Sequence, residues 1–286
     1  MSELLCTELT GRKLLRVSGE DAPRFLHGLV TCDVEHLQPG EIAFGALLSP
    51  QGKILFDFFI VRSVNGFIID TDASMAEDLA KRLNFYKLRA KVDITPMDER
   101  AHAFAIWGTG AADKAVADGV VASDPRLMEM GARAYIRRAP PDTGEAPLAA
   151  WHRHRIELGM PEGGLDFVFG NAFPHEALMD QFKGVDFAKG CYVGQEVVSR
   201  MQHRGTARKR LIKVTSGTEL PESGTEILVG GTACGALAST AGKAGLAMVR
   251  LDRAAAHATG TPAYAGTTEV TLSIQPWAGF GWPEAG

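Results

Sequence analysis

Cysteine is scarce in this chain of 286 residues, and its placement excludes two classes of small protein. The four cysteines are scattered and form no Cys-x-x-Cys pair, so neither a disulfide framework nor a structural zinc site is expected. No apolar run approaches the ~18 residues that a membrane span needs. The first residues contain neither a basic segment nor a long apolar stretch, so no secretory signal is expected. These absences predict a soluble, cytoplasmic protein without a membrane partner.

An excess of charge of one sign is also missing. The chain has 30 Lys or Arg and 34 Asp or Glu residues, which gives a formal net charge of −4. This balance argues against a general binder of nucleic acid and leaves room only for a local basic cluster. Hydrophobic residues make up 45% of the chain, as in ordinary globular proteins, and the length provides for two domains or three small lobes.

The N-terminal part of the chain, residues 1–98, is predicted to form an α+β lobe. Strand-like runs separated by Pro-x-Gly and Asn-Gly turns predict hairpins. In the segment after them, Met75, Leu79 and Leu83 recur at helical spacing and predict an amphipathic helix. The expected strands are 14–18, 42–48, 54–62, 67–70 and 92–94, and the expected helices are 24–30 and 72–89.

Two further regions follow in the sequence. Residues 99–206 again mix strand-like and helix-like runs, which predicts a second α+β lobe. Residues 207–286 contain short β-rich runs separated by Gly, Thr and Pro, which predicts a small β-barrel or sandwich. The expected strands are 103–107, 132–138, 210–214, 226–229, 246–249 and 270–274, and the expected helices are 111–117 and 147–158.

Two patterns that resemble ligand sites have ordinary explanations. Gly-Thr-Gly-Ala-Ala-Asp at 108–113 is similar to a dinucleotide fingerprint, but Asp113 occupies the third glycine position, where its charge would repel a pyrophosphate. An ordinary turn between a strand and a helix is expected there. His152 and His154 lie two apart on an expected helix and therefore point to different faces. No metal site is predicted.

The most informative segment is Lys-Gly-Cys-Tyr-Val-Gly-Gln-Glu-Val-Val-Ser-Arg, residues 189–200. Its cysteine, Cys191, lies between two glycines just before a helix-like run over 195–203. The positive end of the helix dipole and the cation of Lys189 both favour the thiolate form of such a cysteine. A small buried cysteine in a tight loop, beside a solvated basic face, accounts for the same spacing, and both interpretations stay open at this point.

Basic residues gather in and after this segment. From residue 189 to residue 213 the chain has seven Lys or Arg residues and one carboxylate, Glu196. Arg200, Arg204 and Arg208 are spaced by four, so those that lie within a helix share one face. Such a face attracts an anionic partner. Few aromatic residues are interleaved with it and no RNA-binding motif is recognisable, which argues against nucleic acid.

The twelve-residue segment resembles the signature of the YgfZ family of folate-binding proteins, whose mitochondrial relatives assist iron–sulfur cluster maturation. Other matches extend over most of the chain, namely Gly-Glu-Asp-Ala at 19–22, Ser-Pro-Gln-Gly at 49–52, Arg-Ile-Glu-Leu-Gly at 155–159 and Pro-His-Glu at 174–176. The family is similar to the T-protein of the glycine cleavage system. The resemblance implies two α+β lobes and a C-terminal β-barrel, arranged as a three-lobed ring around a folate channel.

The resemblance also implies which residues hold tetrahydrofolate, in free or polyglutamylated form. Glu157 matches a pterin-binding glutamate, and a carboxylate accepts the two parallel N–H donors of a pterin edge. The alternative for Glu157 is an ion pair with an arginine of its own helix. Asp57 matches an aspartate near folate N5 and N10 and is implied to be catalytic, although the aminomethyltransferases carry Asp-Asp where this chain has Phe56-Asp57. The implied cofactor-binding residues are Asp57, Glu157, Lys189, Tyr192, Gln195, Glu196 and Arg200, and the basic stripe is implied to hold the glutamate tail.

Three functions follow from these residues. The first is a folate-binding accessory protein that supports assembly or repair of iron–sulfur clusters in client enzymes or with assembly proteins. Cys191 would be its reactive thiol, acting as a nucleophile, a redox thiol or a transient cluster ligand. One cysteine cannot supply the usual all-cysteine ligation of a cluster, so further ligands from another chain or a small molecule are implied. The second is a folate-dependent aminomethyltransferase, and the third is a module that binds RNA or protein without catalysis. Whether the chain is an enzyme stays open.

Overall fold

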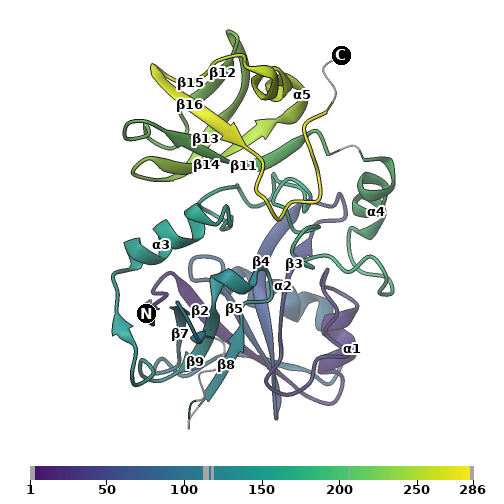
Figure 1. Ribbon diagram of the computed structural model, residues 1–286. Helices are drawn as coiled ribbons and strands as arrows, with labels where there is room; N and C mark the ends of the chain where they lie inside the picture. Colours follow the sequence, from purple (N-terminus) through teal and green to yellow (C-terminus); the bar gives the residue numbers. More distant parts are fainter. Residues whose placement is uncertain (1–3, 112–115, 117–118, 206, 284–286) are drawn as a thin grey trace. The chain divides into compact units, whose positions relative to one another are not determined.

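The computed structural model describes residues 4–111, 116, 119–205 and 207–283 (Figure 1). The chain divides into two compact units, Met1–Trp151 with Phe182–Val197, and His152–Gln181 with Val198–Gly286. The division falls inside two helices, α3 (Leu148–Glu157) and α4 (Gln195–Arg204). Each unit is therefore described by itself.

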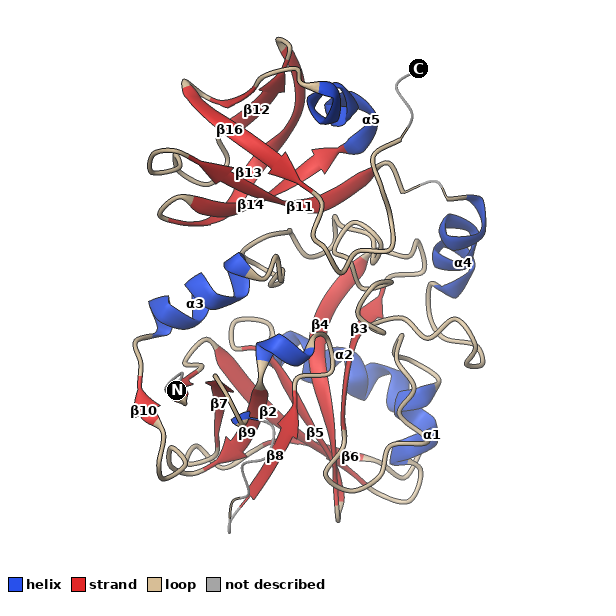
Figure 2. Ribbon diagram, viewed as in Figure 1, coloured by secondary structure: helices blue, strands red, loops and turns tan. Residues whose placement is uncertain are grey.

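The first unit contains a five-stranded antiparallel sheet that carries two helices on one face (Figure 2). In sheet order its strands are β3 (Ile42–Leu48), β4 (Ile54–Ser63), β5 (Gly66–Asp72), β2 (Arg12–Ser18) and β6 (Asp93–Pro96), and the helices are α1 (Ala22–His27) and α2 (Ala76–Lys87). Side chains alternate along a strand, so Phe56, Phe58 and Ile60 of β4 join the core under the helices. Asp57 consequently points to the opposite face of the sheet.

A second five-stranded sheet completes the first unit. In sheet order its strands are β10 (Gly144–Glu145), β1 (Leu5–Glu8), β7 (His102–Trp107), β9 (Ala132–Ile136) and β8 (Gly119–Ser123). The short edge strand β10 runs parallel to β1, whereas the other pairs are antiparallel. A short 3-10 helix, η2 (Met128–Met130), precedes β9. Cys6, Phe104 and Ile106 belong to a small core on one face of this sheet.

A buried ionic network joins the two sheets of the first unit. Asp70 on β5 accepts a hydrogen bond from Arg12 Nε at 2.6 Å, within its own sheet. From β9 of the other sheet, Arg133 Nη1 at 2.9 Å and the Tyr135 hydroxyl at 3.0 Å donate to the same carboxylate. Burial opposes the ionisation of Asp70, but the charges of Arg12 and Arg133 outweigh it and hold its pKa below the usual range. The network is thus a specific electrostatic link between residues far apart in the sequence.

The second unit is built around a closed six-stranded barrel. In barrel order its strands are β11 (Lys209–Ser216), β14 (Ala244–Arg250), β13 (Thr232–Ala241), β12 (Glu226–Val229), β15 (Ala263–Ala265) and β16 (Thr268–Ser273), with α5 (Leu251–Ala254) and the 3-10 helix η3 (Ala255–Thr259) between β14 and β15. Closure leaves no free sheet edge. A buried ion pair fixes the segment before the barrel, because Arg155 Nη1 lies 2.6 Å from Asp166 Oδ2 and the backbone N–H of Ser239 on β13 donates to Asp166 Oδ1 at 2.9 Å.

These elements confirm the α+β fold class with a C-terminal barrel, and they decide for a barrel over a sandwich. The strand expected at 42–48 is found with the same ends. Most of the helix expected at 111–117 lies outside the described residues. The domain limits at 98/99 and 206/207 stay a prediction. In the part of the chain that the structure describes, no helix combines the length and apolar character that crossing a membrane would require.

Candidate functional site

The loop that carries Cys191 is held in the first unit by the ammonium group of Lys189. Its Nζ atom donates three hydrogen bonds, to the carbonyl oxygens of His27 (2.7 Å), Val30 (2.7 Å) and Cys32 (2.8 Å). These carbonyls lie at and just after the end of α1, where the helix dipole favours a cation. An ammonium group has three N–H donors, so all of them hold the loop, and a contact between Lys189 and folate would have to replace one.

Further hydrogen bonds fasten the same loop upstream of its cysteine. The Thr31 hydroxyl donates to the carbonyl oxygen of Gly184 at 2.5 Å, and the backbone N–H of Asp186 donates to the Thr31 carbonyl at 2.9 Å. The Asp186 carboxylate then accepts the backbone N–H groups of Ala188 (2.8 Å) and Lys189 (3.1 Å). Sequence reasoning missed Asp186. The sequence signal for this residue was an aspartate that stands two and three residues before the N–H groups that donate to it, a spacing typical of an Asx turn.

Two glycines let this loop pack closely on the turn between β3 and β4. Gly194 has φ +82°, and a Cβ atom at this position would lie 2.5 Å from the carbonyl oxygen of Ser49. Gly52 in that turn has φ +79°, and its Cβ atom would lie 3.0 Å from Cβ of Val197. The positive φ at both positions favours glycine, and at Gly194 the backbone of Ser49 also leaves no space for a Cβ atom. The structure thus brings together two motifs that stand far apart in the sequence.

Cys191 is exposed, which removes the interpretation of a small buried cysteine. The other three cysteines, all described by the structure, are buried. Burial raises the pKa of the Cys32 thiol to about 12 and that of the Cys6 and Cys234 thiols to about 11. At neutral pH these three thiols stay protonated and enclosed. Cys191 is therefore the cysteine whose sulfur solvent, a ligand or a partner protein reaches.

Tyr192, next to this cysteine, points into the protein. The residue is 7% exposed, and its ring lies 5.5 Å from Lys189 Nζ. Within the described residues its buried hydroxyl has no hydrogen-bond partner, and burial raises its pKa to about 12. A buried hydroxyl without a partner costs about 1–3 kcal/mol, so this atom is a candidate donor to a bound molecule.

The predicted carboxylates lie in different surroundings. Asp57 is 5% exposed on β4, opposite Ala46 of β3, and it belongs to the first unit together with Lys189. Glu157 belongs to the second unit, at the end of α3, and is exposed. Within the described part of the chain its carboxylate makes no hydrogen bond or ion pair, while Lys213 Nζ donates to its backbone carbonyl at 2.6 Å. The alternative interpretation, an ion pair between Glu157 and an arginine of its own helix, is therefore wrong.

The remaining predicted residues lie on α4, which begins at Gln195, as expected, and ends one residue later than expected. Gln195 and Glu196 form its first turn, and Arg200 and Arg204 are exposed one turn apart on the same side. Arg208 lies beyond the helix, so the basic stripe is shorter than its spacing predicted. The helix start belongs to the first unit and the two arginines to the second.

Replacement of Lys189 by methionine is expected to destabilise the first unit by about 1.5–3 kcal/mol, because three carbonyls lose a charged donor. Urea unfolding followed by circular dichroism measures the effect. Lys183→Met is the matched control, because Lys183 is exposed in the same region and no hydrogen bond of its side chain is seen in the described structure. Equal stability of the two variants would show that the three hydrogen bonds do not hold the loop.

Comparison with known proteins first defines the fold. Residues 6–131 match the model of the GCVT N-terminal domain, and residues 208–280 match that of the CAF17 C-terminal β-barrel domain. The crystal structure of glycine cleavage system aminomethyltransferase T from Bartonella henselae superposes with a TM-score of 0.77, over 97% of this chain and 87% of that one. The two sequences are 16% identical, so this likeness concerns the fold. The chain has the fold of a T-protein-like aminomethyltransferase with a C-terminal barrel.

Comparison with curated proteins then gives the family. The human iron–sulfur cluster assembly factor IBA57, mitochondrial, is 34% identical over 270 residues, covering 83% of this chain and 73% of the human protein. The mouse protein of the same name is 31% identical, covering 98% and 86%. The chain belongs to the IBA57 family of iron–sulfur cluster assembly factors. The Neurospora crassa homologue is 34% identical over 229 residues, and the chain spans about half of its length, 52%.

These relatives refine one expectation and overturn another. The resemblance to the YgfZ family leads, more specifically, to IBA57 proteins with a GCVT-like domain and a CAF17-type barrel. The expectation of a cytoplasmic protein is wrong, because the human, mouse and Neurospora crassa relatives are named mitochondrial, which points to mitochondria instead. The error arose because overall amino-acid composition does not distinguish one cellular compartment from another.

Proposed function

We propose that this chain takes part in the assembly of iron–sulfur clusters, with Cys191 as its reactive thiol and tetrahydrofolate as its cofactor. The observation that supports the proposal best is the construction of the cysteine loop. Lys189 and Gly194 fix the loop on both sides of an exposed sulfur, in a chain of the IBA57 family. A sulfur that is accessible on a rigid support suits transfer between partners better than a buried structural thiol does.

In this proposal the cluster is cargo, and a second molecule is required to hold it. Clusters are usually held by four cysteines, and the chain offers one exposed cysteine. In the described residues, no group of three or more His, Cys, Asp and Glu side chains is arranged to hold a metal ion. The remaining ligands therefore come from a client enzyme, an assembly protein or a small molecule. This requirement makes the chain an accessory factor, in the way that its resemblance to the YgfZ family implies.

Several residues fit the demands of a bound folate. The carboxylate of Glu157 is exposed and uncommitted within the described structure, so it can accept the N3–H and 2-amino donors of a pterin. Tyr192 offers a buried hydroxyl without a partner in the same described part of the chain. Asp57 is a carboxylate on the sheet face away from the helices. When bound, tetrahydrofolate would supply a carrier for one-carbon units. Glu157 is the candidate acceptor within the second unit, and Asp57 and Tyr192 are candidate contacts within the first.

The charges of α4 fit the other end of a folate. Arg200 and Arg204 are exposed one turn apart, and His203 lies between them. Cations near the C-terminus of a helix are favourably placed, and a glutamate tail offers carboxylates as their counter-charges. We therefore assign the tail, rather than the pterin, to this helix, and we expect polyglutamylated tetrahydrofolate to bind more tightly than the monoglutamate.

Complementation tests the assembly function. The chain is expressed in cells that lack their own IBA57 relative. The activity of iron–sulfur enzymes is then measured in cell extracts, with enzymes that contain no cluster as the control. Restored activity of the iron–sulfur enzymes alone supports the proposal. Failure to restore it, with the chain folded and present in the same compartment as the missing protein, would refute it.

Tetrahydrofolate is expected to raise the melting temperature of the purified chain, because a ligand that binds the native state stabilises it. Glu157→Gln exchanges one acceptor oxygen for a donor and should weaken binding by about 1–3 kcal/mol, as measured by calorimetry. Glu219→Gln is the control, because Glu219 is exposed and lies outside the implied site. An unchanged melting curve at saturating folate, or equal affinity of both variants, would contradict the folate assignment.

Aminomethyl transfer is the second candidate, and the fold favours it. The T-protein-like architecture covers nearly the whole chain, at 97%. Against it, the chain has Phe56-Asp57 where the resemblance implies Asp-Asp, and a transfer from an aminomethyl carrier to folate has no step that needs a thiol. A glycine cleavage assay that measures ammonia release distinguishes the two. Release that survives Cys191→Ala would favour the transferase.

A further inference from the structure

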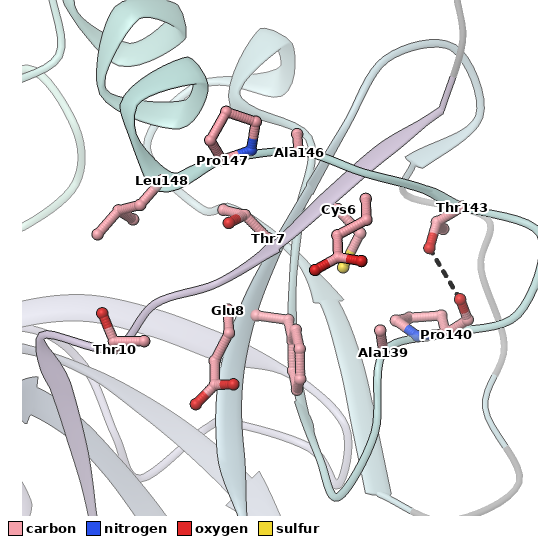
Figure 3. Close-up of a pocket in the computed structure, with 12 residues that line it drawn as sticks. Cys6, Thr7, Glu8, Thr10, Ala139, Pro140, Thr143, Ala146, Pro147 and Leu148 are labelled. Atoms are coloured by element: carbon pink, nitrogen blue, oxygen red, sulfur yellow. Dashed lines mark hydrogen bonds between the residues drawn. The ribbon is translucent and has the colours of Figure 1, made fainter.

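A cavity of about 480 Å³ opens in the first unit and shares no residue with the cysteine loop (Figure 3). It is bordered by β1, by the loop from Ala139 to Thr143, and by the start of α3 at Leu148. Its volume falls in the range of roughly 300–1,000 Å³ that is typical of small-molecule sites. Within the loop, the Thr143 hydroxyl donates to the carbonyl oxygen of Pro140 at 2.8 Å, which fixes this wall.

The charge of the cavity has one sign. Glu8 and Glu145 line it, and no Lys, Arg or His is among the described residues that do so. Cys6 pairs with Glu145 in the parallel register, and Glu8 follows Cys6 by two, so the three side chains share one face of the sheet. His102, outside the cavity, lies 2.7 Å from one oxygen of Glu8. The second carboxylate oxygen of Glu8 makes no hydrogen bond within the described structure.

The floor and walls are apolar or neutral. Phe104, Pro147 and Leu148 provide apolar surface, and Cys6 is 2% exposed. Burial raises the pKa of the Cys6 thiol to about 11, and the charge of Glu145 acts in the same direction. The thiol is therefore protonated at neutral pH, and it offers neither a nucleophile nor an anionic metal ligand. The two carboxylates alone give the cavity its negative charge.

We propose that this cavity binds an organic cation, a primary ammonium or guanidinium group on a short apolar stem, with Glu8 and Glu145 as its counter-charges. Anions are excluded, because no cation lines the cavity to offset the two carboxylates. A cation keeps its charge there because two carboxylates lie nearby and the site reaches solvent; the Glu8 side chain is 41% exposed and Glu145 is exposed. The stem gains by contact with Phe104 and Leu148. The same chemistry is found in a free amine and in a Lys or Arg side chain of another protein.

Isothermal titration of the purified chain at low ionic strength tests the proposal, with agmatine and cadaverine as probes and 1-pentanol as the neutral control. Both cations are expected to bind and pentanol is not. Glu8→Gln and Glu145→Gln should each weaken cation binding about tenfold, because each removes a charged acceptor. Glu269→Gln, an exposed carboxylate on the barrel, should leave it unchanged. Ala139→Trp, at the exposed rim, should block the cavity without a change of charge.

A further arm distinguishes the source of the cation. Acetyl-Ala-Arg-Ala-amide presents the guanidinium group as a protein does, and tighter binding of this peptide than of agmatine assigns the cavity to a protein side chain. Tighter binding of agmatine assigns it to a free amine. The proposal is overturned if no cation binds the wild-type chain, or if binding is the same in the double variant Glu8→Gln/Glu145→Gln. Cys191→Ala should bind the cations like the wild type, so the result is independent of the proposed assembly function.

Discussion

Cys191→Ala is expected to lower iron–sulfur enzyme activity in complemented cells to the level of cells without the chain. The reason is that no other cysteine can take over. Cys6, Cys32 and Cys234 are buried, and burial raises the pKa of each thiol to about 11 or 12. A buried, protonated thiol is neither a nucleophile nor a cluster ligand. The loss should therefore be complete rather than partial, and it should appear in every iron–sulfur client that depends on the chain.

Two controls separate chemistry from folding in this experiment. An exposed side chain contributes little to stability, so the melting temperature of Cys191→Ala should match that of the wild type. Cys234→Ala makes the same atomic change at a buried site of the barrel and should keep full activity at some cost in stability. The folate affinity of Cys191→Ala should also be retained. If this variant complements fully, the thiol has no part in assembly, while the proposal of a folate site would stand unaffected.

Local sequence patterns predicted the long apolar strands of the first unit well, and they missed several other strands. The runs at 42–48 and 54–62 were apolar, long enough and bounded by turns, and they became β3 and β4 with nearly the same ends. The short strands β1, β8, β10 and β15 were missed, and so was the ten-residue barrel strand β13. Very short strands carry little periodicity, and β13 is interrupted by small residues. The pairing of β1 is set by β7, about a hundred residues away in sequence, and that of β10 by β1. Tertiary context therefore decides such elements.

The candidate site shows a similar division. The glycines on both sides of Cys191 predicted a tight loop before a helix, and α4 begins at Gln195 as expected. The partners of Lys189 were not predictable, since its ammonium binds backbone carbonyls that any residue would supply. The sequence predicted a cation that activates the thiol or holds folate, whereas the structure shows one whose three donors anchor the loop on α1. Likewise, nothing near Asp70 in the sequence indicates its distant partner Arg133.

The largest expected loss of stability comes from Asp70→Ala, at about 3–5 kcal/mol, because the substitution leaves two buried guanidinium groups without their shared counter-charge. Arg12 and Arg133 both donate to this carboxylate, and all three side chains are almost fully enclosed. Since the free energy of unfolding of a domain is about 5–15 kcal/mol, the variant should be marginally folded at best. Asp70→Asn keeps the shape of the side chain and one acceptor oxygen. The loss of stability should therefore be smaller than for Asp70→Ala, but still well above the loss caused by breaking an ion pair at the surface.

The pH dependence of unfolding identifies the network as the cause. The pKa of Asp70 is lowered in the folded chain, so its contribution is present above the unfolded pKa of about 3.9 and is lost as the pH falls through the folded value. The difference in urea stability between wild type and Asp70→Asn should therefore be largest at neutral pH and shrink in acid. Asp98→Ala is the control, because Asp98 and Arg100 form an exposed pair at 2.6 Å, and exposed ion pairs contribute little to stability. Equal losses for Asp70→Ala and Asp98→Ala at neutral pH would mean that the two sheets are joined by apolar packing alone.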